Sequence, residues 1–444
     1  MKVVIIGASF AGVAAALEVS NRYSDAEVIL LEKQVTLGYI PNGLHLYWDK
    51  KIEHLNDARF TTREQLEKEG ITCCLHAEVQ KINIDKKVIA YDYHGKEESI
   101  AYDKLIIATG SHQLSDKIIG GSEESVLKYK WYDQAQAALS RVKESQRVAI
   151  IGGGQVGVEA ADLLIRQGKK VTLIESMDYV LFKYFDKEMI HPITRKMVEA
   201  GLDVRLQKTV SSVSMEPDNT TTVVLGNETV AADAVVMSVN VRPDLDFLDN
   251  RIELNADSTI AVDCYLRTSA KDVFAVGDCI QLSGPGEDRV YIPVINNAVR
   301  TGMVAASNLI EPTTPFKGSL RTIGTKVFDH YIASTGLTEA ESAFTGRRVK
   351  SHRQEVRLSS YENAETAVLK WVYDAQNHEL LGAQITSTAD VLEKINTLAL
   401  AIQTKQTIEA LQQKDYFFHP SYVNMVSATN LVPWIGERTD RDES

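Results

Sequence analysis

The sequence contains few cysteines, and none near its start. Residues 1–72 lack cysteine, and the cysteines present form no CxxC, CxxxxC or cysteine–histidine pattern with metal-ligand spacing, so no metal site is predicted. Cys73 and Cys74 are adjacent in a segment that alternates like a strand, which places their side chains on opposite faces and favours inert thiols over a redox pair. Cys264 and Cys279 are predicted to be packing residues.

Long apolar runs and an excess of basic charge are also missing. No apolar run approaches the roughly 20 residues that span a bilayer. The formal charge of -12 argues against nucleic acid or an anionic membrane as a partner. The N-terminal apolar run is four residues long and ends at a glycine, which indicates a buried strand and not a signal sequence. We therefore expect a cytoplasmic globular protein of two to four domains.

Residues 2–32 have the pattern of a dinucleotide-binding unit. A β-branched strand leads into Gly7, and an alanine-rich helix follows with the spacing G-x-S-x-x-G, in which Ser9 takes the place of the usual middle glycine. That position lets the backbone approach a pyrophosphate, and serine is the smallest polar substitute. Glu32 ends the next strand 20 residues after Gly12, where an acid binds a ribose hydroxyl. Strand, loop, helix, strand and acid in register indicate nucleotide binding.

A second unit of the same kind begins at residue 147. Gly152, Gly154 and Gly157 form a complete G-x-G-x-x-G between strand and helix, and Glu175 closes the next strand 18 residues later. The helix start offers free N–H groups and a positive dipole end to a pyrophosphate. No arginine or lysine directly follows Glu175 to receive a 2′-phosphate, so NADH is favoured over NADPH.

Three later segments extend this pattern. Residues 102–111 and 232–243 each place an apolar strand before a turn of small residues, at corresponding points after the two units. A third strand ends at Gly277 and Asp278, and an aspartate there can accept hydrogen bonds from a ribityl chain or lie near its phosphate. Residues 130–146 are predicted to form a helix, and residues 350–385 alternate like antiparallel strands of an interface sheet.

Together these motifs resemble the pyridine nucleotide–disulfide oxidoreductases, and within them the NADH peroxidase, NADH oxidase and coenzyme A–disulfide reductase group. The resemblance covers nearly the whole chain and includes ATG (108–110), DVFAVGDC (272–279), GTKVFDHYIASTGLTE (324–339), LGAQITS (381–387) and DYFFHPSY (415–422). It implies an α/β fold with two Rossmann-like dinucleotide-binding domains, for FAD and NAD, and a C-terminal α+β dimerisation domain. The expected boundaries are 1–112 and 246–320 for the two parts of the FAD domain, 113–245 for the NAD domain, and 321–444 for the C-terminal domain with its charged tail.

The resemblance also implies the cofactors and their residues. FAD is expected at the first loop and NADH at the second. The residues expected to bind the two cofactors are Gly7, Ser9, Phe10, Ala11, Gly12, Glu32, Lys33, Val79, Ala108, Thr109, Gly110, Gly152, Gly154, Gln155, Val156, Gly157, Glu175, Tyr184, Asn240, Gly277, Asp278 and Ala298. A homodimer is implied in which the C-terminal segment of one subunit completes the flavin site of the other. His419 would lie there as a catalytic residue, or equally as a structural interface histidine.

The chain departs from this family pattern at its reactive positions. Asn42 stands where the group carries a redox cysteine, and Tyr47 stands where a second cysteine would be needed. Phe10 replaces the histidine of peroxidases, Gln155 replaces a tyrosine that screens the flavin, and Asn240 replaces a glycine. Without a thiolate at this place, the family's route of disulfide and coenzyme A–disulfide reduction is excluded.

The chemistry that remains is hydride transfer from NADH to FAD and onward to O2 or a small acceptor. We therefore predict a hydrogen-peroxide-forming NADH oxidase or an NADH:acceptor oxidoreductase, in which Asn42 donates a hydrogen bond toward the flavin edge. Glu159 is expected to orient the nicotinamide amide or a lysine, with a solvated helix acid as the alternative. Two other hypotheses are a non-catalytic FAD/NADH-binding redox sensor and a reductase of a small electron-carrier protein; such carriers are acidic, and this acidic chain would steer them poorly.

Overall fold

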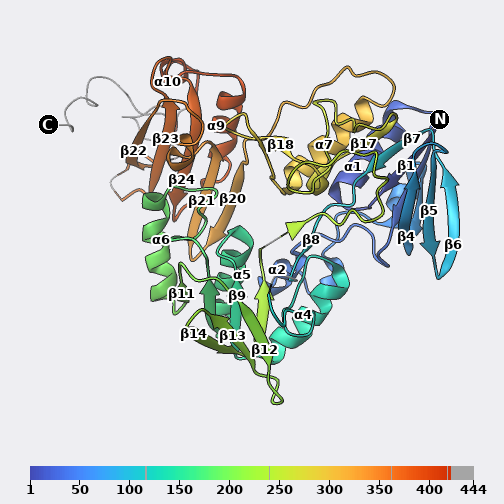
Figure 1. Ribbon diagram of the computed structural model, residues 1–444. Helices are drawn as coiled ribbons and strands as arrows, with labels where there is room; N and C mark the ends of the chain where they lie inside the picture. The colour runs from blue at the N-terminus through green and yellow to red at the C-terminus, as the bar shows by residue number, and fades with distance from the viewer. Residues whose placement is uncertain (116–117, 240, 362, 418, 422–444) are drawn as a thin grey trace.

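A computed structural model describes residues 1–444 except 116–117, 240, 362, 418 and 422–444. The chain forms three bodies (Figure 1). The N-terminal body lies on the right in blue and yellow, the second is green, and the third is orange to red. The charged C-terminal tail lies outside the described residues. None of the helices in the described ranges is long and apolar enough to cross a membrane.

The first body is built on a parallel sheet that takes strands from both ends of the expected FAD domain. Its order is β17-β7-β1-β2-β3. The neighbours pair in parallel, with Ile5 opposite Ile106 and Leu30 in register. The strands have continuous apolar runs because both faces are covered. The bounds are β1 Lys2–Ile6, β2 Glu27–Glu32, β3 Ile71–Leu75, β7 Lys104–Ile107 and β17 Val273–Ala275.

Two helices of the first body lie against each other although they are far apart in the sequence. They are α1 (Phe10–Arg22) and α7 (Ile295–Ser307), drawn in blue and yellow in Figure 1. A Cβ atom added to Gly302 would lie 2.3 Å from the backbone oxygen of Ala11, so the helices meet backbone to backbone. An antiparallel sheet completes this body. Its strands are β4 Ala77–Asn83, β5 Val88–Tyr93 and β6 Lys96–Ala101.

The second body repeats the parallel design with the strand order β11-β10-β9-β15. Its strands and helices include the predicted second unit and the predicted helix after residue 130. The bounds are β9 Arg147–Ile151, β10 Lys170–Ile174, β11 Asp203–Arg205, β15 Ala234–Met237, α4 Tyr132–Glu144, α5 Gln155–Arg166 and α6 Lys187–Glu199. A second, antiparallel sheet contains β12 Ser212–Met215, β13 Thr221–Leu225 and β14 Glu228–Ala232.

Short elements join the first two bodies. The strands β8 (His112–Gln113) and β16 (Val241–Arg242) pair antiparallel where the chain passes between the first and the second body. The helix α2 (Gly43–Trp48) belongs to the N-terminal part of the chain but contacts α4 and α5 of the second body. The remaining short elements are η1 Leu55–Asp57, α3 Arg63–Lys68, η2 Gly277–Cys279, β18 Leu282–Ser283 and β19 Arg289–Val290.

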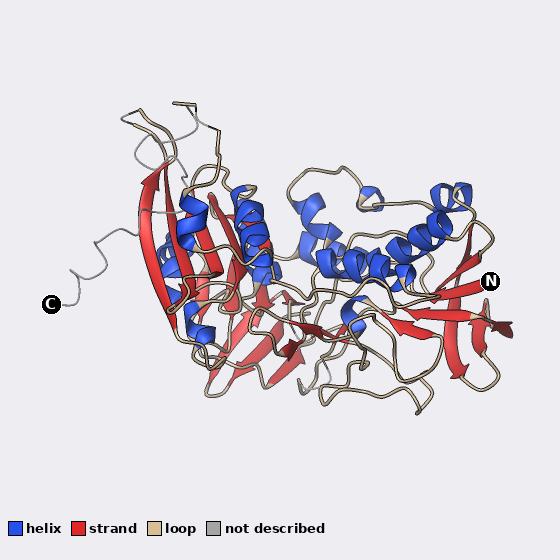
Figure 2. Cartoon of the chain, turned by 90° about the horizontal axis from the view of Figure 1, so that it is seen from above, coloured by secondary structure: helices blue, strands red, loops and turns tan. Residues whose placement is uncertain are grey.

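The third body is an antiparallel sheet with helices against one face, as Figure 2 shows from above. Its order is β20-β21-β24-β23-β22, so the alternation of residues 350–385 correctly predicted antiparallel strands. The helix α9 packs on β21 and β24. The bounds are β20 Ile323–Val327, β21 His330–Gly336, β22 Val349–Arg357, β23 Thr366–Asp374, β24 Leu380–Ser387, α8 Glu339–Ser342, α9 Lys394–Gln403 and α10 Ile408–Gln412.

The cysteines behave as predicted with one exception. Cys73 is buried in β3 and Cys74 is partly buried beside it; burial raises the pKa of both thiols, to about 11 for Cys73. Burial also raises the pKa of Cys279, to about 12. The prediction that Cys264 is a packing residue is wrong, because its side chain is exposed. It lies in a tight turn whose backbone is held by the Asp263 carboxylate, so the thiol faces solvent.

Candidate cofactor-binding and active site

A cavity of about 1300 Å³ lies where the three bodies meet. Its wall combines the two glycine loops, α2, the strand connections 110–113 and 238–246, and the start of β20. Pockets for one drug-sized ligand usually have volumes of roughly 300–1,000 Å³. The cavity is therefore large enough for more than one extended ligand.

The first loop is shaped by close backbone contacts. Gly7 has φ +101°, and a Cβ atom there would lie 2.4 Å from the backbone oxygen of Ala108. A Cβ atom at Gly12 would lie 1.8 Å from the backbone oxygen of Gly7. The Glu32 carboxylate accepts hydrogen bonds from the backbone N–H of Ala8 at 2.7 Å and of Gln34 at 2.8 Å. Burial raises the pKa of Glu32, and the two bonds fix its carboxylate at the loop.

The second loop uses the same device. Gly152 has φ +111°, and a Cβ atom at Gly157 would lie 1.9 Å from the backbone oxygen of Gly152. The Glu175 carboxylate accepts hydrogen bonds from the backbone N–H of Gly153 at 2.7 Å and of Met177 at 2.8 Å. A Cβ atom at Gly154 would meet no atom within 4 Å, so this glycine leaves the helix start of α5 open to the cavity. Such an open helix start suits a pyrophosphate.

Most of the residues predicted to bind cofactors line this one cavity. They are Gly7, Ser9, Phe10, Ala11, Glu32, Lys33, Val79, Ala108, Thr109, Gly110, Gly154, Gln155, Val156, Glu175, Tyr184, Asp278 and Ala298. Four of the predicted glycines do not line the cavity: Gly12, Gly152, Gly157 and Gly277. They shape the loops, because a side chain at any of them would lie too close to neighbouring atoms. Asn240 lies outside the described residues.

Of the three predicted catalytic residues, Asn42 and Glu159 line the cavity and His419 does not. His419 is exposed near the end of the described chain, in the third body. The backbone N–H of Ser421 donates to its Nδ1 atom at 3.2 Å. Its expected place in a partner's site concerns the dimer and stays a prediction.

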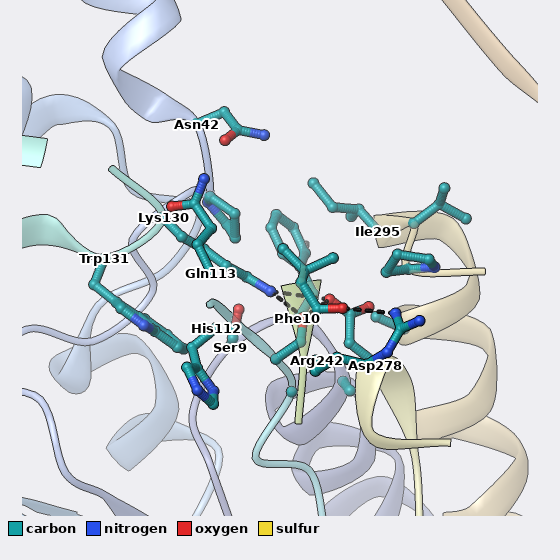
Figure 3. Close-up of a pocket in the computed structure, with 18 of the residues that line it drawn as sticks. Ser9, Phe10, Asn42, His112, Gln113, Lys130, Trp131, Arg242, Asp278 and Ile295 are labelled. Atoms are coloured by element: carbon teal, nitrogen blue, oxygen red, sulfur yellow. Dashed lines mark hydrogen bonds and ion pairs between the residues drawn. The ribbon is translucent and has the colours of Figure 1, made fainter. Parts of the chain in front are cut away.

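Asn42 has an unusual backbone conformation. Its φ and ψ angles of 63° and 20° are left-handed, and it precedes the six-residue helix α2 without a side-chain cap. Asparagine tolerates this conformation better than other residues with a side chain. Phe10 lines the same cavity (Figure 3) and stacks on Phe60 with ring centroids 3.9 Å apart. No cysteine occurs among the described residues that line the cavity.

Glu159 is held by three side chains from three parts of the fold. Its carboxylate accepts hydrogen bonds from Thr325 Oγ1 at 2.6 Å and Gln155 Nε2 at 3.0 Å, and it lies 3.2 Å from His45 Nδ1. Burial tends to raise the pKa of Glu159, but the bonds from His45, Thr325 and Gln155 outweigh burial and lower it. Its side chain is 22% exposed, which argues against the alternative of a solvated helix acid. Its basic partner is His45 and not a lysine.

Sequence reasoning missed a polar group beside Asp278. Lys130 Nζ lies 3.0 Å from Asp278 Oδ2 and donates to Ser111 Oγ, whose hydroxyl donates to the same carboxylate at 2.8 Å (Figure 3). Arg242 lines the same cavity, with its guanidinium 4.8 Å from the ring centroid of Tyr291. Ser111 and Arg242 lie within the segments 102–111 and 232–243, and Lys130 begins the predicted helix 130–146, so the sequence offered their positions but not their proximity to Asp278.

The family model described as pyridine nucleotide-disulphide oxidoreductase matches residues 1–302, and the model of the dimerisation domain of the same family matches residues 322–429. The chain therefore belongs to the pyridine nucleotide-disulphide oxidoreductases, and the predicted fold of two Rossmann-like domains and a dimerisation domain is confirmed.

Relatives within this family extend over nearly the whole chain. An NADH oxidase of Enterococcus faecalis (strain V583) is 31% identical over 438 residues, covering 97% of this chain and 98% of the relative. The crystal structure of a pyridine nucleotide-disulfide family oxidoreductase from Enterococcus faecalis V583 is 40% identical with a TM-score of 0.88, covering 97% and 98% of the two chains. The water-forming NADH oxidase from Lactobacillus brevis bound to NADH is 29% identical with a TM-score of 0.92, covering 97% and 96%.

Proposed function

We propose that this protein is an FAD-dependent NADH oxidase that releases hydrogen peroxide, or that passes the electrons to another small acceptor, without a cysteine redox centre. The observation that carries the proposal is the pair of glycine loops opening on one cavity in which Asn42 stands at the start of α2. Relatives named NADH oxidase, similar over nearly their whole length, support NADH as the electron donor.

The residues present fit both cofactors. Each loop approaches its neighbours so closely that a side chain at Gly12 or Gly157 would collide with backbone, which leaves the helix starts free for a pyrophosphate. The first loop, Glu32 and Asp278 would hold FAD, and the second loop with Glu175 would hold NADH. When bound, FAD accepts the hydride of NADH and supplies two electrons to the final acceptor.

The side chains around the cavity would orient the two cofactors and select NADH over NADPH. Glu175 disfavours a 2′-phosphate because a carboxylate would face a second negative group. The ionised Glu159 and its partner Gln155 line the cavity together and offer an acceptor and an amide to the nicotinamide carboxamide. Lys130 and Ser111 keep the Asp278 carboxylate in place beside the first loop. Asn42 offers a neutral amide donor where a thiolate would otherwise act.

The product of the proposed reaction follows from this neutral side chain. One NADH, one proton and one dioxygen give one NAD⁺ and one hydrogen peroxide, and both electrons are then accounted for. Further reduction of peroxide to water in this group uses a cysteine thiolate. An asparagine amide cannot be oxidised in this way, and Phe10 offers no proton at the neighbouring position. Peroxide is therefore the expected end product with dioxygen.

The decisive experiment measures the ratio of hydrogen peroxide formed to NADH oxidised under air. We expect a yellow protein whose flavin absorbance bleaches with NADH, and a ratio close to one. Added catalase should return half of the oxygen consumed. A ratio near zero with full oxygen uptake would contradict the proposal, because the protein would then reduce peroxide without a thiolate at this place. Bound FAD with negligible NADH turnover for any acceptor would favour the redox-sensor hypothesis instead.

A further inference from the structure

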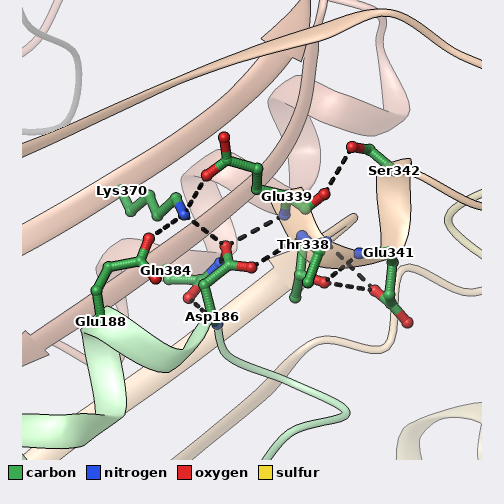
Figure 4. Close-up of polar contacts among 9 residues, drawn as sticks. Asp186, Glu188, Thr338, Glu339, Glu341, Ser342, Lys370 and Gln384 are labelled. Atoms are coloured by element: carbon green, nitrogen blue, oxygen red, sulfur yellow. Dashed lines mark hydrogen bonds and ion pairs between the residues drawn. The ribbon is translucent and has the colours of Figure 1, made fainter.

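A buried ammonium group joins the second and third bodies of the molecule. Lys370 extends from β23, and its side chain is only 2% exposed. Three carboxylates surround it (Figure 4): its Nζ atom lies 2.9 Å from Asp186 Oδ2 and 2.6 Å from Glu339 Oε2, and it also pairs with Glu188. Asp186 and Glu188 belong to the second body, so Lys370 bridges two bodies. The single ammonium offsets one of the three negative charges, and the other two are shared by Glu188 and Glu339, whose side chains are about half exposed to water.

Asp186 is the most enclosed of the three acids. Its side chain is 4% exposed, whereas those of Glu188 and Glu339 are 49% and 47% exposed. Its carboxylate also accepts hydrogen bonds from the backbone N–H of Ala340 at 3.0 Å and from Gln384 Nε2 at 2.7 Å. The amide oxygen of Gln384 in turn accepts the backbone N–H of Asp186 at 2.8 Å. Residue 186 is therefore fixed to the third body through both its side chain and its backbone.

The ion pairs keep these groups charged. Burial favours the neutral form of both partners, but the three carboxylates hold the pKa of Lys370 above its ordinary value. Burial likewise tends to raise the pKa of Asp186, but the bonds from Ala340, Lys370 and Gln384 outweigh it and lower the pKa. Removing one partner of such a buried ion pair destabilises the fold, because the other charge remains buried without a counter-charge.

The segment before Asp186 leads to the second glycine loop. Leu181, Phe182, Lys183 and Tyr184 all line the cavity. Leu181 has a left-handed φ of 60°, and its backbone N–H donates to the oxygen of Gly153 at 2.8 Å. The backbone N–H of Phe185 donates to the oxygen of Leu181 at 3.2 Å. Residues 181–186 thus connect Gly153 at one end to Lys370 at the other.

We propose that Lys370 is a positioning residue for the NADH site: through Asp186 it holds residues 181–186 against the second glycine loop, so that NADH binding depends on the third body being docked. The inference rests on the proposed function, in which the second loop binds NADH. Because the third body matches the family's dimerisation domain, the same contact links the nucleotide site to the part of the chain expected to form the dimer.

Two variants and one matched control test this role. Lys370→Met removes the ammonium, and Asp186→Asn removes the charge that it holds while keeping the shape. Glu188→Gln is the control, because it removes another carboxylate from the same lysine but leaves the bonds of Asp186 intact. For each protein, FAD content, hydrogen–deuterium exchange of residues 177–186, the Kd for NAD⁺ and steady-state KM and kcat with NADH are measured.

We expect Lys370→Met and Asp186→Asn to retain FAD and to raise Kd and KM about fivefold or more, the lower range of coupling between linked sites, with kcat changed far less. Exchange in residues 177–186 should become faster in both, and Glu188→Gln should stay near wild type. If Lys370→Met does not fold, Asp186→Asn decides. Unchanged exchange and unchanged Kd in Asp186→Asn, or an equal effect of Glu188→Gln, would overturn the inference. A wild type that does not bind NAD⁺ or NADH would overturn the proposed function, whereas the exchange measurement would still decide whether Lys370 holds the segment.

Discussion

Glu159 Oε2 lies 3.2 Å from His45 Nδ1, across the contact between α5 and α2. The two residues come from different bodies of the molecule, and both line the cavity. The imidazole also lies beside two aromatic rings, with Trp48 at 5.7 Å and Tyr129 at 5.6 Å between centroids. This packing holds the ring in place, so the carboxylate of Glu159 is oriented from α2 as well as from its own helix.

The first prediction concerns Glu159. Glu159→Gln should lower kcat/KM for NADH by about tenfold, as expected when a buried charge-assisted contact is removed. The pKa of Glu159 is lowered, so the wild-type carboxylate is ionised at neutral pH and its contribution is lost only as pH falls through that lowered value. The ratio between wild type and variant should therefore be constant between about pH 6 and 8. A ratio that changes in this range would contradict the assignment, and Thr325→Val serves as a control that keeps the charge.

The second prediction concerns the nucleotide. Wild-type kcat/KM should favour NADH over NADPH by about ten- to a hundredfold, or about 1–3 kcal/mol, because Glu175 would face the 2′-phosphate. Initial rates with both nucleotides measure this preference. Equal values would show that Glu175 does not face the ribose. The Glu175 carboxylate also accepts a hydrogen bond from Gly153 N–H. Glu175→Gln should therefore preserve the conformation of the loop better than Glu175→Ala.

The third prediction concerns Asn42→Cys. The left-handed backbone at residue 42 is unfavourable for cysteine, so the variant should be less stable than wild type by about 1–2 kcal/mol, and Asn42→Gly should not be. Chemical unfolding measures this difference. If a thiolate forms there, the ratio of peroxide to NADH should fall below that of wild type, with Asn42→Gly as the matched control. The change is expected to be modest because Phe10 and Gln155 remain. An unchanged ratio in a well-folded variant would contradict the role of this position.

The fourth prediction concerns the dimer. The third body matches the family's dimerisation domain, and it exposes the large apolar side chains of Phe344, Phe417 and Leu400, which are 87%, 73% and 61% exposed. Light scattering at micromolar concentration should therefore give twice the mass of one chain. His419→Ala should lower turnover without lowering FAD content if the partner's site includes this histidine. A monomer would exclude any shared site, and normal turnover of the variant would leave His419 a structural role.

The fifth prediction concerns pH and stability. Arg147 and two backbone N–H groups bind the Asp233 carboxylate and lower its pKa from 3.8 to about 2. A lowered pKa stabilises the fold above the ordinary value, and this contribution is lost as pH falls from about 4 to 2. Allowing for solvent screening, Asp233→Asn should lower the free energy of unfolding by about 1 kcal/mol at pH 7. The difference in free energy of unfolding between wild type and Asp233→Asn should shrink at pH 3 and below. A difference that stays constant with pH would contradict the prediction.

The glycine loops could be predicted from the sequence because their spacing is local. Gly7 and Gly152 need a left-handed turn within a few residues of a strand and a helix, and this requirement is visible in the motif. The pairs His45–Glu159 and Lys130–Asp278 could not be predicted in this way, since their partners are 114 and 148 residues apart. No periodicity connects such residues, and only the docking of separate bodies brings them together.

The cysteines and Asn42 show a second limit. The opposite orientations of Cys73 and Cys74 were predicted from alternation along a strand, but the exposure of Cys264 depends on a turn that the sequence pattern did not reveal. The identity of residue 42 was evident at once, whereas its left-handed backbone was not, because α2 has only six residues and no side-chain cap to signal its start.

The edge strand β17 has a consequence for the order of synthesis. It pairs with β7, so the first sheet is complete only when residues 273–275 meet residues 104–107. Everything needed for the parallel sheet of the second body lies between these segments in the chain. On a ribosome, the second body can therefore fold while the first still lacks a strand and the helix α7. The nascent chain therefore holds a nearly finished nucleotide domain beside an open-edged one, and the open edge closes only after residues 273–275 have been made, before the strands of the third body follow.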